Sequence, residues 1–210
     1  MPSDPRRRIS TTFATRPHAT PLITMTHEAK LAAAFVAVLS SLVVDYDARQ
    51  KSNRMTFFVV EQLATLTPEA LAEHRSWLGT SACDWLADRV HELSYTNVEL
   101  GPFARALGNE LSPFRWFPER RALLQAEIDA SVLHLYQLDR SQAEWLLDSF
   151  TVLRKYEERD HGEFRTKRLV LEIYDALAAA IRLGRPYQTR LDPPPADPRC
   201  CHAVGDYVAA

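Results

Sequence analysis

The sequence predicts a mainly α-helical fold with a small α+β part near the N-terminus, a helical C-terminal scaffold and an extended proline-rich tail. Apolar residues recur at helical spacing through most of residues 80–183. One short run at 55–60 is dense in β-branched and aromatic residues, which favour strands. Prolines crowd residues 192–198, where neither helix nor sheet can form. Hydrophobic residues make up 46% and charged residues 25% of the 210 residues, which is the composition of a globular protein.

The first predicted elements are a helix, a polar loop and a strand. Residues 28–44 are apolar on nearly every face and Thr26 can cap them, which predicts a largely buried helix. The polar stretch 45–54 is predicted to be a loop that leads into a buried strand at 55–60. Residues 67–69 open another short helix, because the proline among them suits the first helical position.

From residue 80 onward the predicted elements are nearly all helices. We expect them at 81–94, between the Gly-Pro pair at 101 and the Ser-Pro pair at 112, from Pro118 to about 137, from Ser141 onward, and at 163–183 before Gly184. The chain is therefore divided into an irregular N-terminal segment (1–24), a helix–loop–strand part (25–78), a helical domain (79–185) and an extended Pro-rich tail (186–210).

The residues contain no motif for catalysis or for binding a cofactor. An S-adenosylmethionine or nucleotide site on a doubly wound sheet needs a glycine-rich turn, whereas the six glycines of this chain are scattered. Residues 192–195, Asp-Pro-Pro-Pro, echo the Asp/Asn-Pro-Pro-aromatic motif of amino-methyltransferases, but proline replaces the ring that stacks on the base. The chain itself is therefore expected to bind no cofactor, and these motifs do not decide whether it belongs to an enzyme.

Cysteines and apolar runs bear on metals, compartment and membranes. Cys200, Cys201 and His202 are adjacent, but the second pair of ligands that a structural zinc site needs is missing. The three cysteines form no disulfide framework and no signal-peptide apolar core is visible, so a cytoplasmic location is predicted. The longest apolar run, at 31–44, is too short to span a membrane, and no membrane partner is expected.

The first candidate DNA contact is a basic cluster in the predicted loop at 45–54. Cations there can reach phosphates, and amide side chains can read base edges. Its members are Arg49, Gln50, Lys51, Asn53 and Arg54. A solvated turn is the alternative interpretation. Residues 1–60 hold eight Lys and Arg against four Asp and Glu, whereas residues 61–140 hold seven against twelve, so any DNA contact must be local.

A second basic cluster lies around the start of the last predicted helix. It includes Arg154, Lys155 and Arg159, and then the candidate DNA contacts Arg165, Lys167 and Arg168. Cations in a first helical turn oppose the helix dipole, which would suit a bound phosphate. A surface laced with ion pairs explains the same residues equally well, and the sequence does not separate the two interpretations.

Three stretches resemble one protein family. The first stretch, residues 33–66, is similar to a segment of large single-chain adenine-specific DNA methyltransferases. It contains Leu-Ser-Ser-Leu-Val-Val-Asp-Tyr-Asp-Ala-Arg-Gln-Lys at 39–51 and Phe-Phe-Val-Val-Glu-Gln-Leu at 57–63. These enzymes occur in type IIG restriction–modification and in the BREX and DISARM phage-defence systems. Residues 150–168 and 184–198 resemble the end of the same proteins, in the same order. The resemblance covers roughly residues 10–202. Ser52-Asn53-Arg54 replaces the usual glycine turn, and Ala64 replaces a proline.

The resemblance implies a non-catalytic, C-terminal DNA-recognition region. In the family a methyltransferase domain with the S-adenosylmethionine and Asn-Pro-Pro-Tyr motifs precedes this region. We therefore expect double-stranded DNA and a methyltransferase domain in another chain as partners, with S-adenosylmethionine bound by that domain. Residues 1–24 are interpreted as an irregular remnant of an upstream Thr/Arg-rich stretch.

Two alternatives come from other classes of function. One is a helical protein-interaction module, or an inactive remnant, without DNA binding. The acidic middle of the chain, residues 61–140, favours it mildly. The other is an independent enzyme that uses Cys200, Cys201 or His202, which the missing motifs disfavour.

Overall fold

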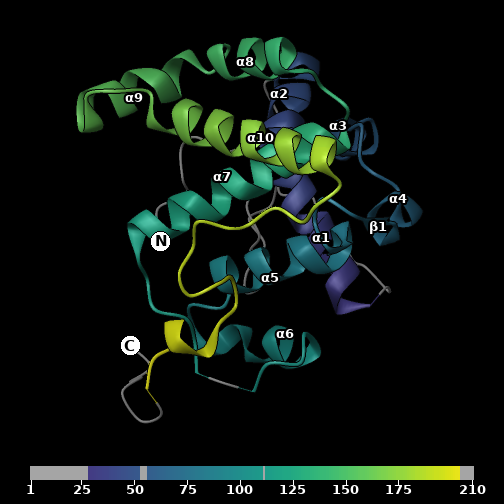
Figure 1. Cartoon of the computed structure of the whole chain (residues 1–210), viewed down its shortest axis with the longest axis vertical. Coiled ribbons are helices and arrows are strands. Elements are labelled where there is room, and N and C mark those ends of the chain that lie inside the picture. The colour runs from purple at the N-terminus through teal and green to yellow at the C-terminus, as the bar shows by residue number, and fades with distance from the viewer. Residues whose placement is uncertain (1–27, 53–55, 111, 204–210) are drawn as a thin grey trace.

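The protein is mainly helical, as the sequence predicts (Figure 1). The computed structural model describes residues 28–52, 56–110 and 112–203. The segment 1–24, Thr26, Asn53 and Arg54 therefore lie outside the described residues. The described helices are α1 (Ala29–Leu39), α2 (Leu42–Lys51), α3 (Phe57–Glu61), α4 (Pro68–Ala72), α5 (Ala82–Ser94), α6 (Gly101–Ala106), α7 (Pro118–Leu135), α8 (Arg140–Asp148), α9 (Thr151–His161) and α10 (Arg165–Leu183). Short 3-10 helices lie at Val98–Leu100 and Pro198–Cys200.

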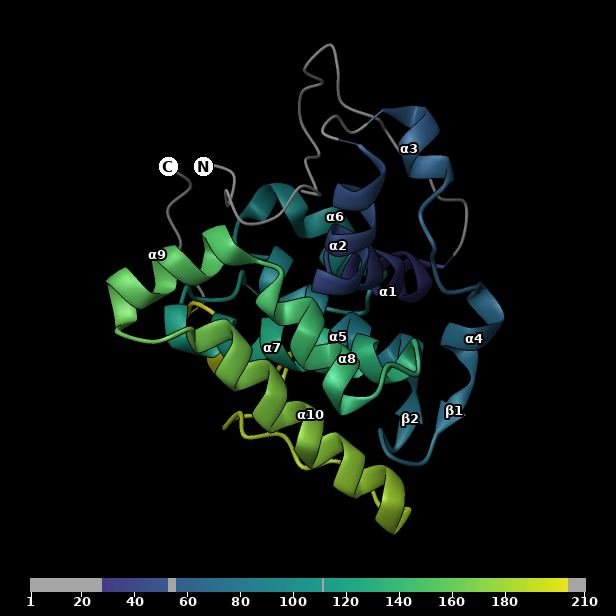
Figure 2. The ribbon, with the colours of Figure 1, turned by 90° about the horizontal axis from the view of Figure 1, so that it is seen from above.

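The core lies where α7 is packed between α10 and α5, with α1 against α5 (Figures 1 and 2). Leu86 of α5, Val132 of α7 and Leu177 of α10 are fully buried there. Three alanines of α1, at 33, 34 and 37, are also fully buried and allow that helix to approach its neighbour closely. One continuous hydrophobic cluster extends from Ala33 to Ala180. The predicted parts 25–78 and 79–185 thus share a core.

The helix predicted at 28–44 is broken by its two serines. Ser41 begins α2, because its hydroxyl accepts a hydrogen bond from the amide of Val44 and donates one to the carbonyl of Val38. The amide of Leu42, freed at the break, donates to Asp129 Oδ1 of α7 at 2.8 Å. The axes of α1 and α2 differ by 60°. No single helix of the described residues is long and apolar enough to cross a membrane, and only this bent pair meets those criteria when combined.

The loop and the strand predicted at 45–60 are wrong in the described residues. Residues 45–51 continue α2, and residues 57–61 form α3, which begins where Thr56 Oγ1 accepts a hydrogen bond from the amide of Val59. A strand needs a neighbouring strand and a buried face, whereas Phe57 and Phe58 are 61% and 71% exposed. Residues 57–60 therefore form a helix despite their β-branched and aromatic composition, because no described strand lies beside them.

The small β component lies further along the chain than the sequence predicts. Strands β1 (His74–Arg75) and β2 (Thr80–Ser81) pair antiparallel, with His74 opposite Ser81 and Arg75 opposite Thr80. They form the one sheet among the described residues. Gly79 turns the chain between them with a φ of 76°. With α4 the hairpin occupies the end of the molecule opposite α9 (Figure 2).

The helices predicted after residue 80 are confirmed, with two adjustments. Asp139 caps α8 in place of the predicted Ser141, and Gln142 completes a capping box with it. Helix α9, which the sequence analysis did not assign, fills residues 151–161. Gly184 ends α10 in a left-handed conformation, as expected.

The predicted extended tail runs back across the molecule from the end of α10 to α6 (Figure 1). Its first anchor is Glu127 of α7, which accepts hydrogen bonds from the hydroxyls of Tyr187 and Thr189. Arg120 holds the next part by donating to the carbonyls of Pro193 at 2.7 Å and Pro194 at 3.0 Å. The described part of the tail, residues 186–203, therefore crosses α7 and α5, and we call it the strap.

The end of the strap joins a second, smaller cluster of buried residues. Phe114 and Cys201 form an isolated β-bridge, and the amide of Arg115 donates to the carbonyl of Cys200 at 2.8 Å. The buried residues of this cluster come from α6, from the 3-10 helix at Pro198–Cys200 and from the chain between α5 and α7. They are Tyr95, Ala104, Phe114 and Cys200.

Candidate nucleic-acid interface

The described members of the first basic cluster lie at the end of α2. Arg49 forms an ion pair with Asp45 of the preceding turn, with Nη2 and Oδ2 2.9 Å apart. Lys51 pairs in the same way with Asp47. Gln50 is exposed between them. Pairs at this spacing on a solvated helix surface stabilise it by only about 0.2–0.5 kcal/mol, so a phosphate could exchange more easily with Asp47 than with Asp45, whose side chain is only 3% exposed.

The second basic cluster is also paired with acids. Lys167 Nζ lies 2.8 Å from Asp148 and 3.0 Å from Glu144, both on α8. Desolvation lowers the pKa of Lys167, but the hydrogen bonds with these two carboxylates outweigh it and leave the pKa raised. Arg168 and Arg165 follow the same pattern. Arg168 bonds Glu163 and Glu172, and Arg165 bonds Glu119 of α7.

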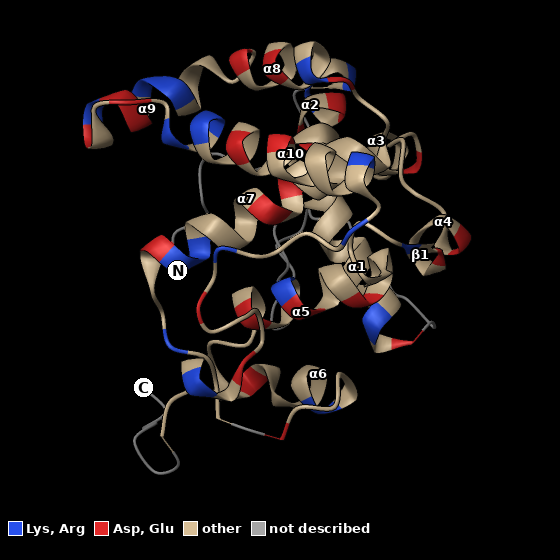
Figure 3. Ribbon diagram, viewed as in Figure 1, with Lys and Arg blue, Asp and Glu red and all other residues tan. Residues whose placement is uncertain are grey.

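The neighbouring cations on α9 also form ion pairs. Arg154 bonds Glu158 at 2.7 Å and Arg159 bonds Asp160 at 2.7 Å. Basic and acidic side chains consequently alternate over α8, α9 and α10 (Figure 3). The sequence allowed either a surface laced with ion pairs or a phosphate-binding helix start. The structure has the ion pairs.

The start of α10 is occupied as well. Glu157 of α9 accepts the amide of Thr166 at 2.7 Å and the Thr166 hydroxyl at 2.6 Å. This carboxylate takes the place that a phosphate would hold at an open helix N-terminus. A ligand that approaches α10 would therefore meet the arginine and lysine side chains before the backbone amides.

The fold brings one residue of each cluster to the junction of α8 and α9. The guanidinium of Arg49 lies 5.5 Å from the centre of the Phe150 ring, and Lys167 bonds Asp148. Tyr46 and Trp145 also meet edge to face between α2 and α8, with ring centres 5.6 Å apart. Arg165 and Arg168, the other two candidate DNA contacts of the second cluster, pair elsewhere, so the two clusters do not merge into one positive surface.

A cleft that the sequence analysis missed lies between α7, α9 and α10. Its volume is about 440 Å³, and Arg165 is the one candidate DNA contact among the described residues that lies on its wall. Its lining residues also include Trp116, Glu119, Arg121, Gln125, Asp129, Glu157, His161 and Thr166. The signal that could have found it is the run Phe-Arg-Trp-Phe at 114–117, in which aromatic residues surround an arginine.

Arg121 has the least compensated charge of this cleft. Its Nη2 donates to the carbonyl of Leu93 at 2.9 Å, and its guanidinium lies 3.6 Å from the centre of the Trp116 ring. Burial lowers its pKa to about 10, against a small opposing effect of the Glu92 charge. Among the described residues no carboxylate lies within ion-pair distance of it.

The cysteines near the end of the chain have the properties of structural thiols. Cys200 is buried and Cys201 half-buried, and neither forms a disulfide. Burial raises the pKa of both thiols, that of Cys201 to about 11. A nucleophilic or metal-bound cysteine needs the opposite shift. In the part of the chain that the structure describes, no three His, Cys, Asp or Glu side chains converge on a common point.

Comparison with known proteins gives no match. No family model matches the chain, and no curated protein or solved structure is significantly similar to it. The family resemblance stays a prediction that rests on the three stretches of sequence quoted above.

Proposed function

We propose that the chain is a non-catalytic DNA-recognition component of an adenine-specific, S-adenosylmethionine-dependent DNA methylation system. The observation that carries the proposal is that the first two resembling stretches contact each other and the third is bound to α7 of the same fold. Arg49 of the first stretch lies on Phe150 of the second. Tyr187 of the third is anchored on Glu127 of α7, in the middle of the same fold. Because these stretches belong to one packed fold, they support a role shared with the proteins that they resemble.

The proposed division of labour follows from the residues. This chain supplies DNA contacts, whereas a methyltransferase domain in another cytoplasmic chain holds the methyl donor and the target adenine. The proposed phosphate contacts among the described residues are Arg49, Lys51, Arg165, Lys167 and Arg168, and Gln50 is the proposed base reader. An exposed ion pair such as that of Arg168 with Glu163 is worth about 0.2–1 kcal/mol, so exchange of carboxylate for phosphate is an accessible step there.

A salt titration of DNA binding tests this function. Anisotropy of a labelled duplex would be measured with the whole chain at increasing salt. We expect the logarithm of the affinity to fall linearly with the logarithm of salt concentration, by about 0.9 for each phosphate neutralised. No binding at low salt, alone or with a methyltransferase domain, would refute the proposal.

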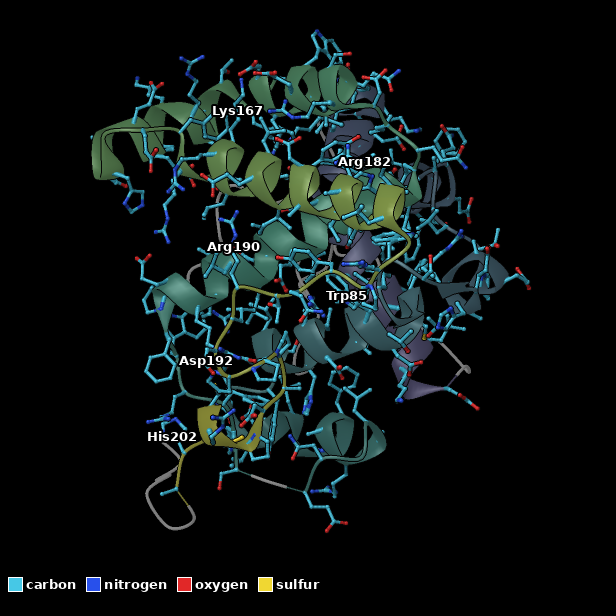
Figure 4. The ribbon with its side chains drawn as sticks, viewed as in Figure 1. Trp85, Lys167, Arg182, Arg190, Asp192 and His202 are labelled. Carbon is cyan, nitrogen blue, oxygen red and sulfur yellow. The ribbon has the colours of Figure 1, made fainter. Side chains whose placement is uncertain are left out.

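A matched pair of variants locates the contact. Arg168 and Arg182 lie at opposite ends of α10, and Figure 4 shows Lys167 and Arg182 marking these two ends. Arg168→Gln should reduce the salt slope by about 0.9, whereas Arg182→Gln should leave it unchanged. Equal effects would mean that binding follows net charge and has no defined site.

A second candidate function is a helical protein-interaction module. Exposed aromatic side chains favour it, since Phe57, Phe58 and Trp145 are each more than 60% exposed. The ion pairs that already neutralise both clusters favour it too. This candidate predicts no salt-dependent DNA binding, so the same titration distinguishes the two functions.

A further inference from the structure

The segment that leads into α7 exposes aromatic rings with arginines beside them. Trp116 is 51% and Phe117 40% exposed. The guanidinium of Arg121 lies on the Trp116 ring at 3.6 Å, and that of Arg115 lies 5.0 Å from the centre of the Phe117 ring. Arg121 covers Trp116 only in part, so aromatic surface remains open to solvent. Aromatic rings beside arginines are a platform on which nucleic-acid bases stack.

The cleft beside this platform has the size and lining of a small-ligand site. At about 440 Å³ it lies in the range that such sites occupy. Trp116 forms part of its wall. Gln125 contributes an amide, and Thr166 and His161 add further polar groups. An amide side chain in such a place can donate to and accept from the edge of a base.

The acids of the cleft are already engaged, whereas its cations are not fully compensated. Asp129 accepts the amide of Leu42, and Glu157 accepts both groups of Thr166. Both carboxylates are almost fully buried. Glu119, the partner of Arg165, has a side chain that is 81% exposed, so solvent weakens this pair.

Arg121 is the strongest indication of a missing anion. It is half-buried and has hydrogen-bonding capacity beyond its one bond to Leu93. Within the described residues it has no carboxylate at ion-pair distance. Arg121 and Arg165 both line the cleft, and two arginines in one cleft suit the binding of a phosphate group.

We propose that the cleft between α7, α9 and α10 binds an unpaired nucleotide of DNA, with its base on Trp116 and its phosphate at Arg121 and Arg165. This inference rests on the proposed DNA-recognition function and deepens it, because it names an unpaired nucleotide as the structural feature that is bound. Stacking selects an unpaired base over a paired one, since a base inside a duplex already has its faces covered.

The test compares three probes with the whole chain. They are a fully paired duplex, the same duplex with one unpaired nucleotide, and free adenosine monophosphate. Anisotropy reports affinity for the duplexes, and tryptophan fluorescence reports stacking. In a Trp145→Phe background Trp116 is the one exposed tryptophan of four, because Trp77 and Trp85 are buried. We expect tighter binding of the duplex with the unpaired nucleotide and quenching of Trp116.

Variants separate stacking from loss of structure. Trp116→Ala should weaken binding of the unpaired nucleotide by about 5- to 100-fold, while Trp116→Phe should retain much of it. Trp145→Ala removes a tryptophan that is also exposed but lies outside the cleft, and it should have no effect. Glu119→Gln frees Arg165 and should tighten binding, by up to about 5-fold.

The outcomes distinguish this inference from the proposed function. Equal affinity for both duplexes, with no effect of Trp116→Ala, overturns the cleft site and leaves DNA recognition standing. Binding of adenosine monophosphate without binding of either duplex overturns a DNA role for the cleft. Absence of binding by all three probes, with the chain alone and with a methyltransferase domain, overturns both proposals.

Discussion

The carboxylate of Glu127 joins three parts of the chain at a single buried point. Arg89 of α5 donates to Oε2 at 2.8 Å, while the tail hydroxyls of Tyr187 and Thr189 donate to Oε1. Glu127 and Arg89 are 1% and 4% exposed. The Arg89 guanidinium also lies on the Trp85 ring. A desolvated ion pair of this kind is stabilising only while both partners are present.

Glu127→Ala is therefore expected to destabilise the protein strongly. It leaves the Arg89 charge buried without its partner and releases both hydroxyls, so the free energy of unfolding should fall by about 3–5 kcal/mol. Urea denaturation measures this change. Glu158→Ala, which breaks the exposed pair with Arg154, is the matched control and should cost less than about 1 kcal/mol. Similar losses from the two variants would contradict the importance of burial.

His91 makes stability depend on pH. Burial lowers its pKa to about 4, and Nε2 accepts a hydrogen bond from Asn109 Nδ2 at 3.0 Å. Protonation of His91 would create a positive charge in a buried place. It would also put an N–H donor on Nε2, opposite the N–H donor of the Asn109 amide. The unfolded chain takes up this proton near pH 6.5, so the stabilisation is complete above pH 6.5 and is lost as the pH falls toward 4. Burial of His134 lowers its pKa and acts in the same direction.

The melting temperature should consequently fall between pH 7 and pH 5. His91→Gln removes the titrating ring and should reduce this fall, whereas His161→Gln on exposed α9 should preserve it. An unchanged pH dependence in His91→Gln would rule out His91 as its origin.

At the scale of elements, local signals predicted the helices after residue 80 but failed around α2 and α3. Caps and prolines such as Pro118 and Gly184 act within a few residues, so the sequence reveals them. The break at Ser41 depends on Asp129, 87 residues away, which accepts the amide that the break frees. The absence of a partner for the predicted strand is likewise decided elsewhere in the chain.

The same distinction applies to the candidate site. Composition revealed that Arg165 and Lys167 were cations, but their partners Glu119 and Asp148 lie 46 and 19 residues away. Pairing across helices has no local signal. The cleft at Trp116 arises from three helices together, so the run at 114–117 could indicate an aromatic segment with an arginine but not the cavity beside it.

Ser41→Ala tests the element boundary between α1 and α2. It removes a cap whose hydroxyl bonds both the Val44 amide and the Val38 carbonyl in a fully buried place. The expected loss is about 1–2 kcal/mol of unfolding free energy, measured in urea. Thr67→Ala removes the cap of the exposed, five-residue α4 and should cost less. An effect of Ser41→Ala no larger than that of Thr67→Ala would mean that the neighbours of Ser41 set the break alone.

At the scale of the whole molecule, the tail connects the main core to the second cluster. Asp192 and His202 mark its course toward the 3-10 helix at Pro198–Cys200 (Figure 4). Arg120 stands at the midpoint, where it bonds Glu92 of α5 and two tail carbonyls. Glu92 in turn accepts the amide of Ala196 at 3.0 Å. Arg120 is therefore the residue that anchors the middle of the strap to α5 and α7.

Arg120→Gln should release the strap while the main core stays folded. The variant leaves the buried Glu92 carboxylate without its cation, and the tail carbonyls lose their shared donor. Cys200, which is buried at the end of the strap, should then react faster with a thiol reagent, by more than about tenfold. Mass spectrometry can follow each cysteine separately, with Cys83 on α5 as the internal reference for global unfolding. Arg199→Gln, which breaks only an exposed pair with Asp197, should leave the rate at Cys200 unchanged. Parallel acceleration at Cys83 and Cys200 would show that the strap and the core unfold as one cooperative unit.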